Sequence, residues 1–233
     1  MTTSSQQPES GRGRLIVAID GPSGAGKGTV ARAVAAHLGY RHVDTGAMYR
    51  AVAWNAVRHG VDLQSESAVA ALASGSVIDV SDGAVIVDGH DVKTAIRTPQ
   101  IDAAAAAVAR LPQVRQVLIV QQRAMGATGG VVMEGRDIGT VVFPDADVKV
   151  YLDASPEERA RRRATDVAHA AGRGTTAVAE IASALEARDN SDRTRAASPL
   201  KEAPGALRID TTGLSIDEVV TRVLSLVKGR SQS

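Results

Sequence analysis

The chain of 233 residues contains no cysteine, and its aromatic residues are limited to one tryptophan, three tyrosines and one phenylalanine. Without cysteine, neither a disulfide framework nor a thiolate metal site is possible, and we expect a reducing, cytoplasmic setting. The few aromatic rings leave little surface for stacking nucleobases, which is how single-strand binders hold their ligand. These two shortages therefore exclude proteins held together by disulfides or by cysteine-bound metals, and they argue against single-strand nucleic-acid binders.

An excess of charge of one sign is also missing. The chain carries 27 Lys and Arg against 26 Asp and Glu, a formal net charge of +1. Broad nucleic-acid-binding surfaces need a positive excess, so we expect no nucleic-acid partner. No run approaches the roughly 18 apolar residues of a membrane span, and the first residues lack the basic and apolar regions of a signal peptide. We therefore expect no membrane partner and no export.

The basic residues are mostly arginine, with 22 arginines and 5 lysines. Arginine binds phosphate and carboxylate groups through two parallel hydrogen bonds, so the excess is consistent with a phosphate-binding protein. A coding bias in an Ala-, Gly- and Val-rich chain would produce the same excess. The positions of the arginines have to distinguish these explanations.

Short β-branched runs alternate with longer helical patterns, which is typical of βαβ units around a parallel sheet. Capping boxes at Ser155 and Ser215 and the pair Thr98-Pro99 predict helix starts, and Pro112 predicts a kink or a break. The sequence therefore predicts an α/β protein. Its expected strands are Leu15–Asp20, Arg41–Val43, Val131–Glu134, Val148–Asp153 and Leu207–Asp210.

One stretch interrupts this alternation. Short β-branched runs joined by Asp-Gly turns predict a small β-rich lobe, inserted between residues 61 and 100. The core is expected in residues 13–60, 101–154 and 178–229, with a separate segment at 155–177. The polar ends, residues 1–12 and 230–233, are expected to be tails, the first of them disordered.

A glycine-rich segment follows the first expected strand and precedes a helical pattern. It reads Gly21-Pro22-Ser23-Gly24-Ala25-Gly26-Lys27-Gly28-Thr29. Strand, glycine-rich turn and helix in this order form a P-loop, in which backbone N–H groups cradle phosphates and Lys27 reaches the β- and γ-phosphates. We expect residues 21–29 to bind ATP, because a chance match would lack the flanking strand and helix.

The hydroxyl of this loop stands at Thr29, one place later than in the form where it ligates Mg²⁺ directly. That shift points to kinases of small molecules and nucleoside monophosphates. We expect Mg²⁺ as the cofactor, held mainly by the nucleotide phosphates and water, with no metal site formed by the protein.

Three further clusters contain residues suited to an acceptor site. Asp44–Arg50 follows the second strand, Glu134–Thr140 follows the third, and Arg188–Arg195 ends a helix. An acceptor phosphate is already anionic, so bringing two polyanions together requires fixed cations rather than a general base. Each cluster alone could be a surface salt-bridge group. Three clusters beside a P-loop favour an acceptor site.

On these motifs the chain resembles the bacterial cytidylate kinases, over about residues 15–227. The resemblance is carried by Asp20–Thr29, Asp44–Arg50, Ile96-Arg97-Thr98, Gly135–Asp145, Leu152–Ser155 and Glu157–Arg159. It implies a three-layer P-loop kinase fold with a central parallel five-stranded sheet, an enlarged monophosphate-binding lobe and a helical lid. It also implies a monomer that uses ATP to phosphorylate CMP or dCMP.

The resemblance assigns expected roles to individual residues. The monophosphate is expected at Arg50, Arg136 and Arg195, the ribose at Arg188 and Asp192, the cytosine at Arg115 and Asp137, and Thr45 lies near the substrate. Lys27, Arg136, Arg162 and Arg195 are expected to take part in catalysis. A family serine that contacts the base aligns with Ala106, so we expect weaker discrimination against uracil, or discrimination through water.

The run Arg161–Arg163 falls in the segment 155–177, where nucleoside-monophosphate kinases have their lid. The alternative is a solvated basic helix face. We expect a lid, with Arg162 as its contact to the transferring phosphoryl group. Two other functions stay open: a kinase of UMP or shikimate, which needs no Arg115–Asp137 pair, and a nucleotide-binding switch without turnover.

Overall fold

The computed structural model describes residues 14–166 and 178–231; the expected tail 1–12 and residues 167–177 of the expected lid lie outside these ranges. Its centre is a parallel sheet of five strands in the order β2-β6-β1-β7-β8. All five expected strands are confirmed. They are β1 (Ile16–Asp20), β2 (Arg41–Asp44), β6 (Val131–Gly135), β7 (Val148–Asp153) and β8 (Leu207–Asp210).

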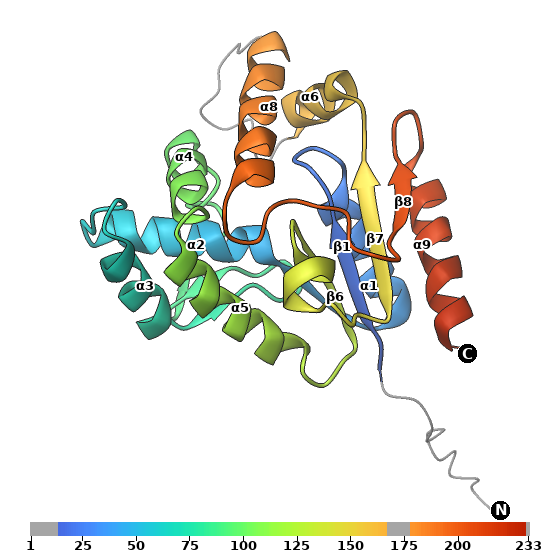
Figure 1. The fold of residues 1–233 in the computed structure, drawn as a ribbon, viewed down its shortest axis with the longest axis horizontal. Helices are drawn as coiled ribbons and strands as arrows, with labels where there is room; N and C mark the ends of the chain where they lie inside the picture. Colours follow the sequence, from blue (N-terminus) through green and yellow to red (C-terminus); the bar gives the residue numbers. More distant parts are fainter. Residues whose placement is uncertain (1–13, 167–177, 232–233) are drawn as a thin grey trace, which may run out of the picture.

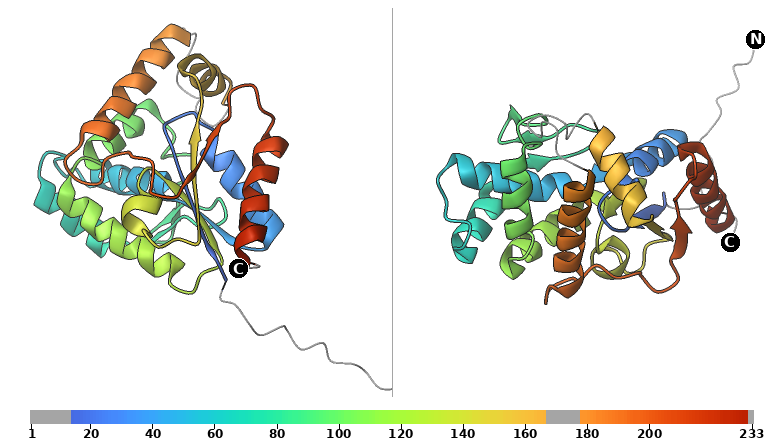
Figure 2. Two further views of the ribbon diagram at one scale, coloured as in Figure 1. Left: turned by 45° about the vertical axis from the view of Figure 1, so that its right-hand side comes forward. Right: turned by 90° about the horizontal axis from the view of Figure 1, so that it is seen from above.

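Both faces of the sheet are covered by helices, as the left view of Figure 2 shows. Val17 and Ile19 of β1 pack with α1 (Lys27–Leu38) and α9 (Ile216–Ser231) on one face. Ala18 points to the other face, toward α2 (Thr45–Arg58) and α5 (Pro112–Gly126). A strand buried on both sides needs apolar residues throughout, which explains the continuous apolar run of β1. The predicted three-layer α/β architecture is confirmed.

The predicted helix starts are also confirmed. The Ser155 hydroxyl accepts a hydrogen bond from the Glu158 N–H at 3.2 Å and begins α6 (Pro156–Thr165). Thr98 caps α4 (Pro99–Val108) in the same way. Before Pro112 the chain turns, so that α4 and α5 make an angle of 96°. No single helix among the described residues is long and apolar enough to cross a membrane, and α4 with α5 qualify only as this bent pair.

The inserted region contains a helix that the sequence analysis did not anticipate, α3 (Glu66–Gly75). After it, β3 (Ile78–Asp79), β4 (Ile86–Val87) and β5 (His90–Asp91) form a small antiparallel sheet. The predicted Asp-Gly turns are present, with positive φ at both residues of each turn. Val69 of α3 and Ile78 of β3 share a core with α2, so this region packs directly on the main fold.

Two helices lie over the carboxyl ends of the strands (Figure 1), namely α6 and α8 (Val178–Thr194). They pack on each other through Ala160, Ile181 and Leu185. Below them, β1 leads into the P-loop, and β6 leads into the π-helical turn η1 (Ile138–Val142). In parallel sheets ligands bind at this edge, so the described helices form a roof over the expected site.

Candidate active site

The P-loop is held tightly against its surroundings, and two of its glycines are there for steric reasons. Gly21 has φ +147°, and a Cβ at this position would lie 2.0 Å from the Leu152 carbonyl oxygen. Gly24 has φ +80°, and a Cβ there would meet the Cβ of Arg159 at 2.9 Å. A side chain at either position would push the loop away from β7 or from α6.

Lys27 is the first residue of α1 and is only 6% exposed. Its Nζ donates a hydrogen bond to the Pro22 carbonyl oxygen at 2.6 Å, so the ammonium lies inside the loop that it closes. Burial, reinforced by the positive charge of Arg136, lowers the pKa of Lys27 to about 7. An anion bound in the loop would favour the charged form of this lysine.

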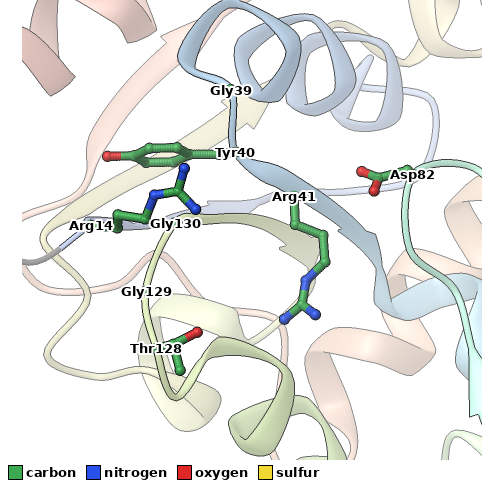
Figure 3. Close-up of a pocket in the computed structure, with 8 residues that line it drawn as sticks. All are labelled: Arg14, Gly39, Tyr40, Arg41, Asp82, Thr128, Gly129 and Gly130. Atoms are coloured by element: carbon green, nitrogen blue, oxygen red, sulfur yellow. The ribbon is translucent and has the colours of Figure 1, made fainter. Parts of the chain in front are cut away.

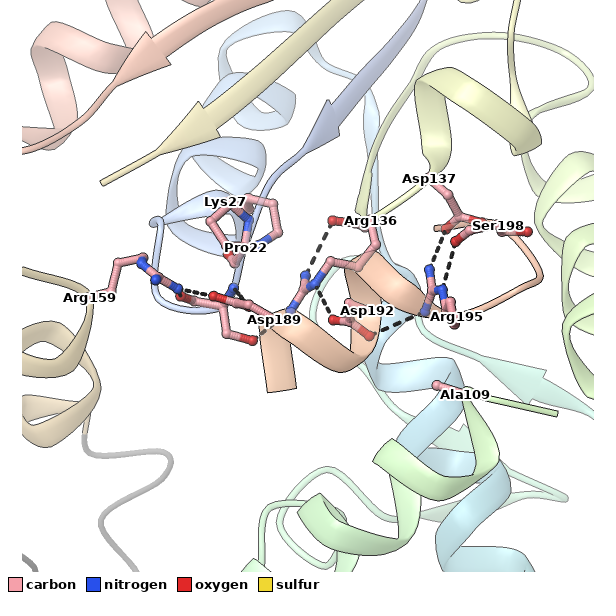
Figure 4. A network of polar contacts seen from close by, with 12 residues as sticks. Pro22, Lys27, Ala109, Arg136, Asp137, Arg159, Asp189, Asp192, Arg195 and Ser198 are labelled. Atoms are coloured by element: carbon pink, nitrogen blue, oxygen red, sulfur yellow. Dashed lines mark hydrogen bonds and ion pairs between the residues drawn. The ribbon is translucent and has the colours of Figure 1, made fainter. Parts of the chain in front are cut away.

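Arg136 connects the P-loop with the end of α8, as Figure 4 shows. One of its terminal nitrogens donates to the Ser23 hydroxyl at 2.7 Å, and its Nε donates to the Asp192 carboxylate at 3.0 Å. Burial pulls the pKa of Arg136 down, but the carboxylates of Asp192 and Asp189 more than offset it, and the pKa lies above its usual value. Arg136 is therefore a fixed positive charge.

The same network continues away from the P-loop (Figure 4). Asp192 also accepts from Arg195 at 3.3 Å, and a second nitrogen of Arg195 lies 3.9 Å from the Asp137 carboxylate. Asp137 in turn pairs with Arg115, which lies 5.2 Å from the ring centroid of Tyr49. One chain of ion pairs thus runs from the P-loop to the residues expected at the base.

Arg50 belongs to a second group of charges. It reaches from α2 to the Asp102 carboxylate on α4, and it lies 3.4 Å from the Ile96 carbonyl oxygen. Asp102 also accepts from Arg163 of α6, at 3.2 Å. Sequence reasoning missed Asp102 as a site residue, because its two arginine partners come from distant segments.

The expected lid arginines point in three directions, so they are not a uniform solvated face. Arg161 is exposed and pairs with Glu158 at 2.8 Å. Arg162 donates to the Thr211 carbonyl oxygen at 2.7 Å, and it lies so near Gly26 that a Cβ on this glycine would be 3.5 Å from its guanidinium. Arg163 faces Asp102. The three neighbours therefore contact the solvent, the P-loop side and the acceptor side respectively.

A pair that the sequence analysis did not place in the site lies behind the P-loop. Asp189 of α8 is 0% exposed and accepts from the Ser23 N–H at 3.1 Å. Arg159 of α6 donates both to Asp189 and to the Ser23 carbonyl oxygen, the latter at 3.1 Å. Arg159 stands in the Glu157–Arg159 motif, so a signal existed, but its partner lies 30 residues away.

Comparison with known proteins agrees with this geometry. The family model for cytidylate kinase matches residues 17–229. A cytidylate kinase of Solibacter usitatus is 46% identical over 217 residues, which cover 93% of this chain and 94% of the relative. One from Geobacter sulfurreducens is 48% identical over 227 residues, with 96% and 97% covered. This chain belongs to the cytidylate kinase family. It is accordingly a nucleoside-monophosphate kinase by class.

A cavity of about 460 Å³ lies between α4, α6 and α8, beside the charges expected to serve a cytidylate kinase. Ala106 of α4 and Leu185 of α8 give it an apolar wall, and Arg163 and Arg188 supply its positive charge. Burial, together with the nearby cations Arg136 and Arg50, lowers the pKa of Arg188 to about 10. Ala106, which the family resemblance expects near the base, is thus one of the residues that line this cavity.

A second cavity, shown in Figure 3, lies at the opposite edge of the sheet, where β2 and β6 begin. The Arg14 guanidinium lies 6.0 Å from the ring centroid of Tyr40, and Arg41 donates to the Met125 carbonyl oxygen. Both cations on its wall already have partners. None of the residues expected to bind substrate in this family lines the cavity.

The carboxylates beside the P-loop bear on how a member of this family would hold magnesium. Asp20 accepts from the N–H groups of Ile138 and Gly139, both at 2.8 Å, and burial raises its pKa to about 6. Glu134 lies 3.2 Å from His42. Among residues 14–166 and 178–231, no three His, Cys, Asp or Glu residues gather as a metal site.

Thr45 is positioned by its own hydrogen bond. Asp44 caps α2 through the Ala47 N–H at 3.0 Å, which makes Thr45 the first helical residue. The Thr45 hydroxyl donates to the Glu134 carbonyl oxygen at 2.7 Å and is buried. The hydroxyl therefore ties the start of α2 to the end of β6, and its lone pairs remain able to accept a hydrogen bond.

Proposed function

We propose that this chain transfers the γ-phosphoryl group of ATP to the phosphate of CMP or dCMP, giving ADP and CDP or dCDP. The observation that carries the proposal is the position of Arg136. Its guanidinium bonds the P-loop at Ser23 on one side and Asp192, beside Arg195, on the other. A fixed cation thus stands between a phosphate cradle and the residues expected to hold the acceptor.

The reaction needs little from the protein besides position and charge. An oxygen of the acceptor phosphate is anionic at neutral pH and attacks the γ-phosphorus without a general base, and the bond to the β-phosphate oxygen breaks. Arg136 and Arg195, with Arg50 from α2, supply the positive charge that brings the two anions together. Lys27 and Arg162 would supply it on the donor side.

The residues proposed to recognise the nucleoside lie at the end of the ion-pair chain that is remote from the P-loop. Cytosine presents ring acceptors and an exocyclic amino donor, so its reader needs both a donor and an acceptor. Arg115 and Asp137 provide them as a buried, paired set. Arg188 and Asp192 are our candidates for the ribose hydroxyls, with Thr45 close to the substrate, and Ala106 leaves room for water where a hydroxyl would stand.

Magnesium would be bound with ATP by the phosphates and water, and it would neutralise charge on the phosphates that Lys27 contacts. We further propose a monomer acting in the cytoplasm, with ATP and CMP or dCMP as its partners and neither nucleic acid nor membrane among them. The near-zero net charge supports the exclusion of nucleic acid.

Steady-state phosphorylation assays with CMP, dCMP, UMP, AMP and shikimate test the proposal. We expect rapid turnover of CMP and dCMP, slower turnover of UMP, and none of AMP or shikimate. Rapid turnover of another acceptor with none of CMP would overturn it. Nucleotide binding without turnover of any acceptor would favour the non-catalytic switch instead.

A further inference from the structure

Asp102 is a carboxylate placed where the acceptor phosphate is expected. It lies on α4 and pairs with Arg50 of α2 and with Arg163 of α6, the second at 3.2 Å. The side chains of Asp102 and Arg163 are 18% and 14% exposed. One carboxylate therefore joins an arginine of the core to an arginine of the helix that roofs the site.

The surroundings of Asp102 carry more positive than negative charge. Arg188 shares the cavity wall with Asp102, Arg163 and Glu180. Burial, and after it the charges of Arg136 and Arg50, lower the pKa of Arg188. Asp192 is already bonded by Arg136 and Arg195. Like charges held together in a partly buried site cost free energy unless an anion lies among them. Asp102 is an anion that the chain itself supplies there.

We propose that Asp102 is a built-in stand-in for the phosphate of the nucleoside monophosphate, holding Arg50 and Arg163 until the substrate phosphate replaces it between them. This inference rests on the proposed function, because it requires a monophosphate acceptor. It makes Asp102 a residue that sets affinity for the acceptor's phosphate, since every binding event has to displace its carboxylate from Arg50.

The proposal also assigns different roles to neighbouring arginines of α6. Arg162 is held by Glu158 and Thr211 on the P-loop side. Arg163 is the one that meets the same carboxylate as Arg50. Arg163 is therefore the α6 residue that already points to the position where the substrate phosphate replaces Asp102. Arg163 binds the acceptor phosphate, and Arg162 remains on the donor side.

The test compares binding of CMP and of cytidine, by calorimetry, to the wild-type protein and to Asp102→Asn, which keeps the shape and removes the charge. We expect Asp102→Asn to bind CMP about three- to tenfold more tightly, because a competing carboxylate is gone. Binding of cytidine, which has no phosphate, should not change. Asp145→Asn, an exposed carboxylate for which no partner is found among the described residues, is the matched control.

Thermal unfolding of Asp102→Asn distinguishes this role from a structural one. Loss of two ion pairs should lower the Tm of Asp102→Asn while its affinity for CMP increases. If Asp102 had only a structural role, the variant would lose thermal stability and CMP affinity together. Asp102→Ser carries the same expectation. Arg163→Gln should raise the KM for CMP at least about threefold, with a smaller effect on the KM for ATP, if roughly one charge-assisted hydrogen bond to the acceptor is lost.

Unchanged or weaker binding of CMP by Asp102→Asn, in a protein whose wild type phosphorylates CMP, would overturn the stand-in role alone. A wild-type protein that turns over some other acceptor and ignores CMP would overturn the proposed function. The two failures are therefore distinguishable in the same set of measurements.

Discussion

Arg136 contacts the P-loop through Ser23 and the acceptor side through Asp192. A variant that lacks this arginine should therefore affect the rate of phosphoryl transfer more than the affinity for ATP. We predict that Arg136→Ala lowers kcat for CMP phosphorylation by about a hundredfold or more, because a cation at the transferring phosphoryl group contributes mainly in the transition state. The Kd for ATP should change little. Rapid-quench kinetics and equilibrium ATP binding measure the two quantities.

Arg222, an exposed arginine of α9, is the control for this variant. Arg222→Ala should leave both kcat and ATP affinity at the wild-type level. If Arg136→Ala loses ATP affinity as severely as turnover, Arg136 belongs to the ATP site and its place between donor and acceptor is wrong.

Lys27 makes ATP binding depend on pH. Its pKa is about 7 in the folded protein and 10.5 in the free amino acid side chain, so the unfolded chain binds more protons between these values. Stability should therefore rise with pH across that window. ATP phosphates favour the charged lysine, so binding takes up a proton above pH 7, and affinity should fall by up to about tenfold per pH unit.

Titration of ATP binding between pH 7 and pH 9 measures this dependence. Lys27→Met should bind ATP weakly and with a flatter profile, whereas Lys228→Met, on the exposed end of α9, should keep the wild-type slope. A wild-type profile without slope would show that Lys27 is already charged before ATP binds.

At the scale of elements, β1, β6 and β7 could be predicted because each contains two or more β-branched residues between turn residues. β2 and β8 contain one β-branched residue each, and they follow from the alternation of strands and helices along the chain. Helix α3 could not, since its N-cap Ser65 makes no side-chain hydrogen bond and two of its three buried residues are alanines, Ala70 and Ala73. The last strand of the inserted lobe, β5, is short for a local reason. Asp91 accepts from the Lys93 N–H at 2.9 Å, and that turn ends the strand.

In the site, as in the fold, residues that depend on the local sequence could be predicted, and residues that depend on contacts between distant segments could not. The P-loop and Thr45 could be placed from sequence because each lies directly after a strand. Asp102 could not, because nothing near it in the sequence indicates that Arg50 and Arg163 meet it. The cluster Arg188–Arg195 was open to interpretation as a surface group, yet Asp189 and Asp192 within it are buried.

The contact of α6 and α8 with the P-loop depends on one buried pair. Arg159 is paired with Asp189, which is fully buried, so Arg159→Met would leave a carboxylate without its cation. We predict a loss of about 3–5 kcal/mol in the free energy of unfolding, measured by urea denaturation. Arg161→Met removes an exposed pair on the same helix and should change stability little. Equal losses in the two variants would contradict the assignment.

At the scale of the whole molecule, the positions of the arginines relate the fold to the proposed function. Many of them, such as Arg58 and Arg222, lie away from the site and are consistent with a compositional bias. Others converge at one edge of the sheet from α2, α5, α6 and the loop after β6, where carboxylates neutralise them in pairs. The net charge of the chain can therefore be near zero although many arginines gather at one site, because carboxylates pair with them. The site becomes strongly cationic toward a phosphate that displaces or shares these carboxylates.

The ion-pair chain from Ser23 through Arg136, Asp192 and Arg195 to Asp137 joins the two halves of that site. We predict that binding of a non-hydrolysable ATP analogue tightens CMP binding by about fivefold or more, because ordering Arg136 at one end orders Asp192 and Arg195 at the other. Ser23→Ala removes the link and should bring this factor close to one.

Calorimetric titration of CMP with and without the analogue, in wild-type and Ser23→Ala proteins, measures the coupling. Linkage requires the same factor when CMP is held constant and the analogue is titrated, so each protein supplies its own internal check. Ser225→Ala, which removes an exposed hydroxyl on α9, should keep the wild-type factor. Full coupling in Ser23→Ala would mean that the two nucleotides communicate through the closing of α6 and α8, and that the ion-pair chain only holds the arginines in place.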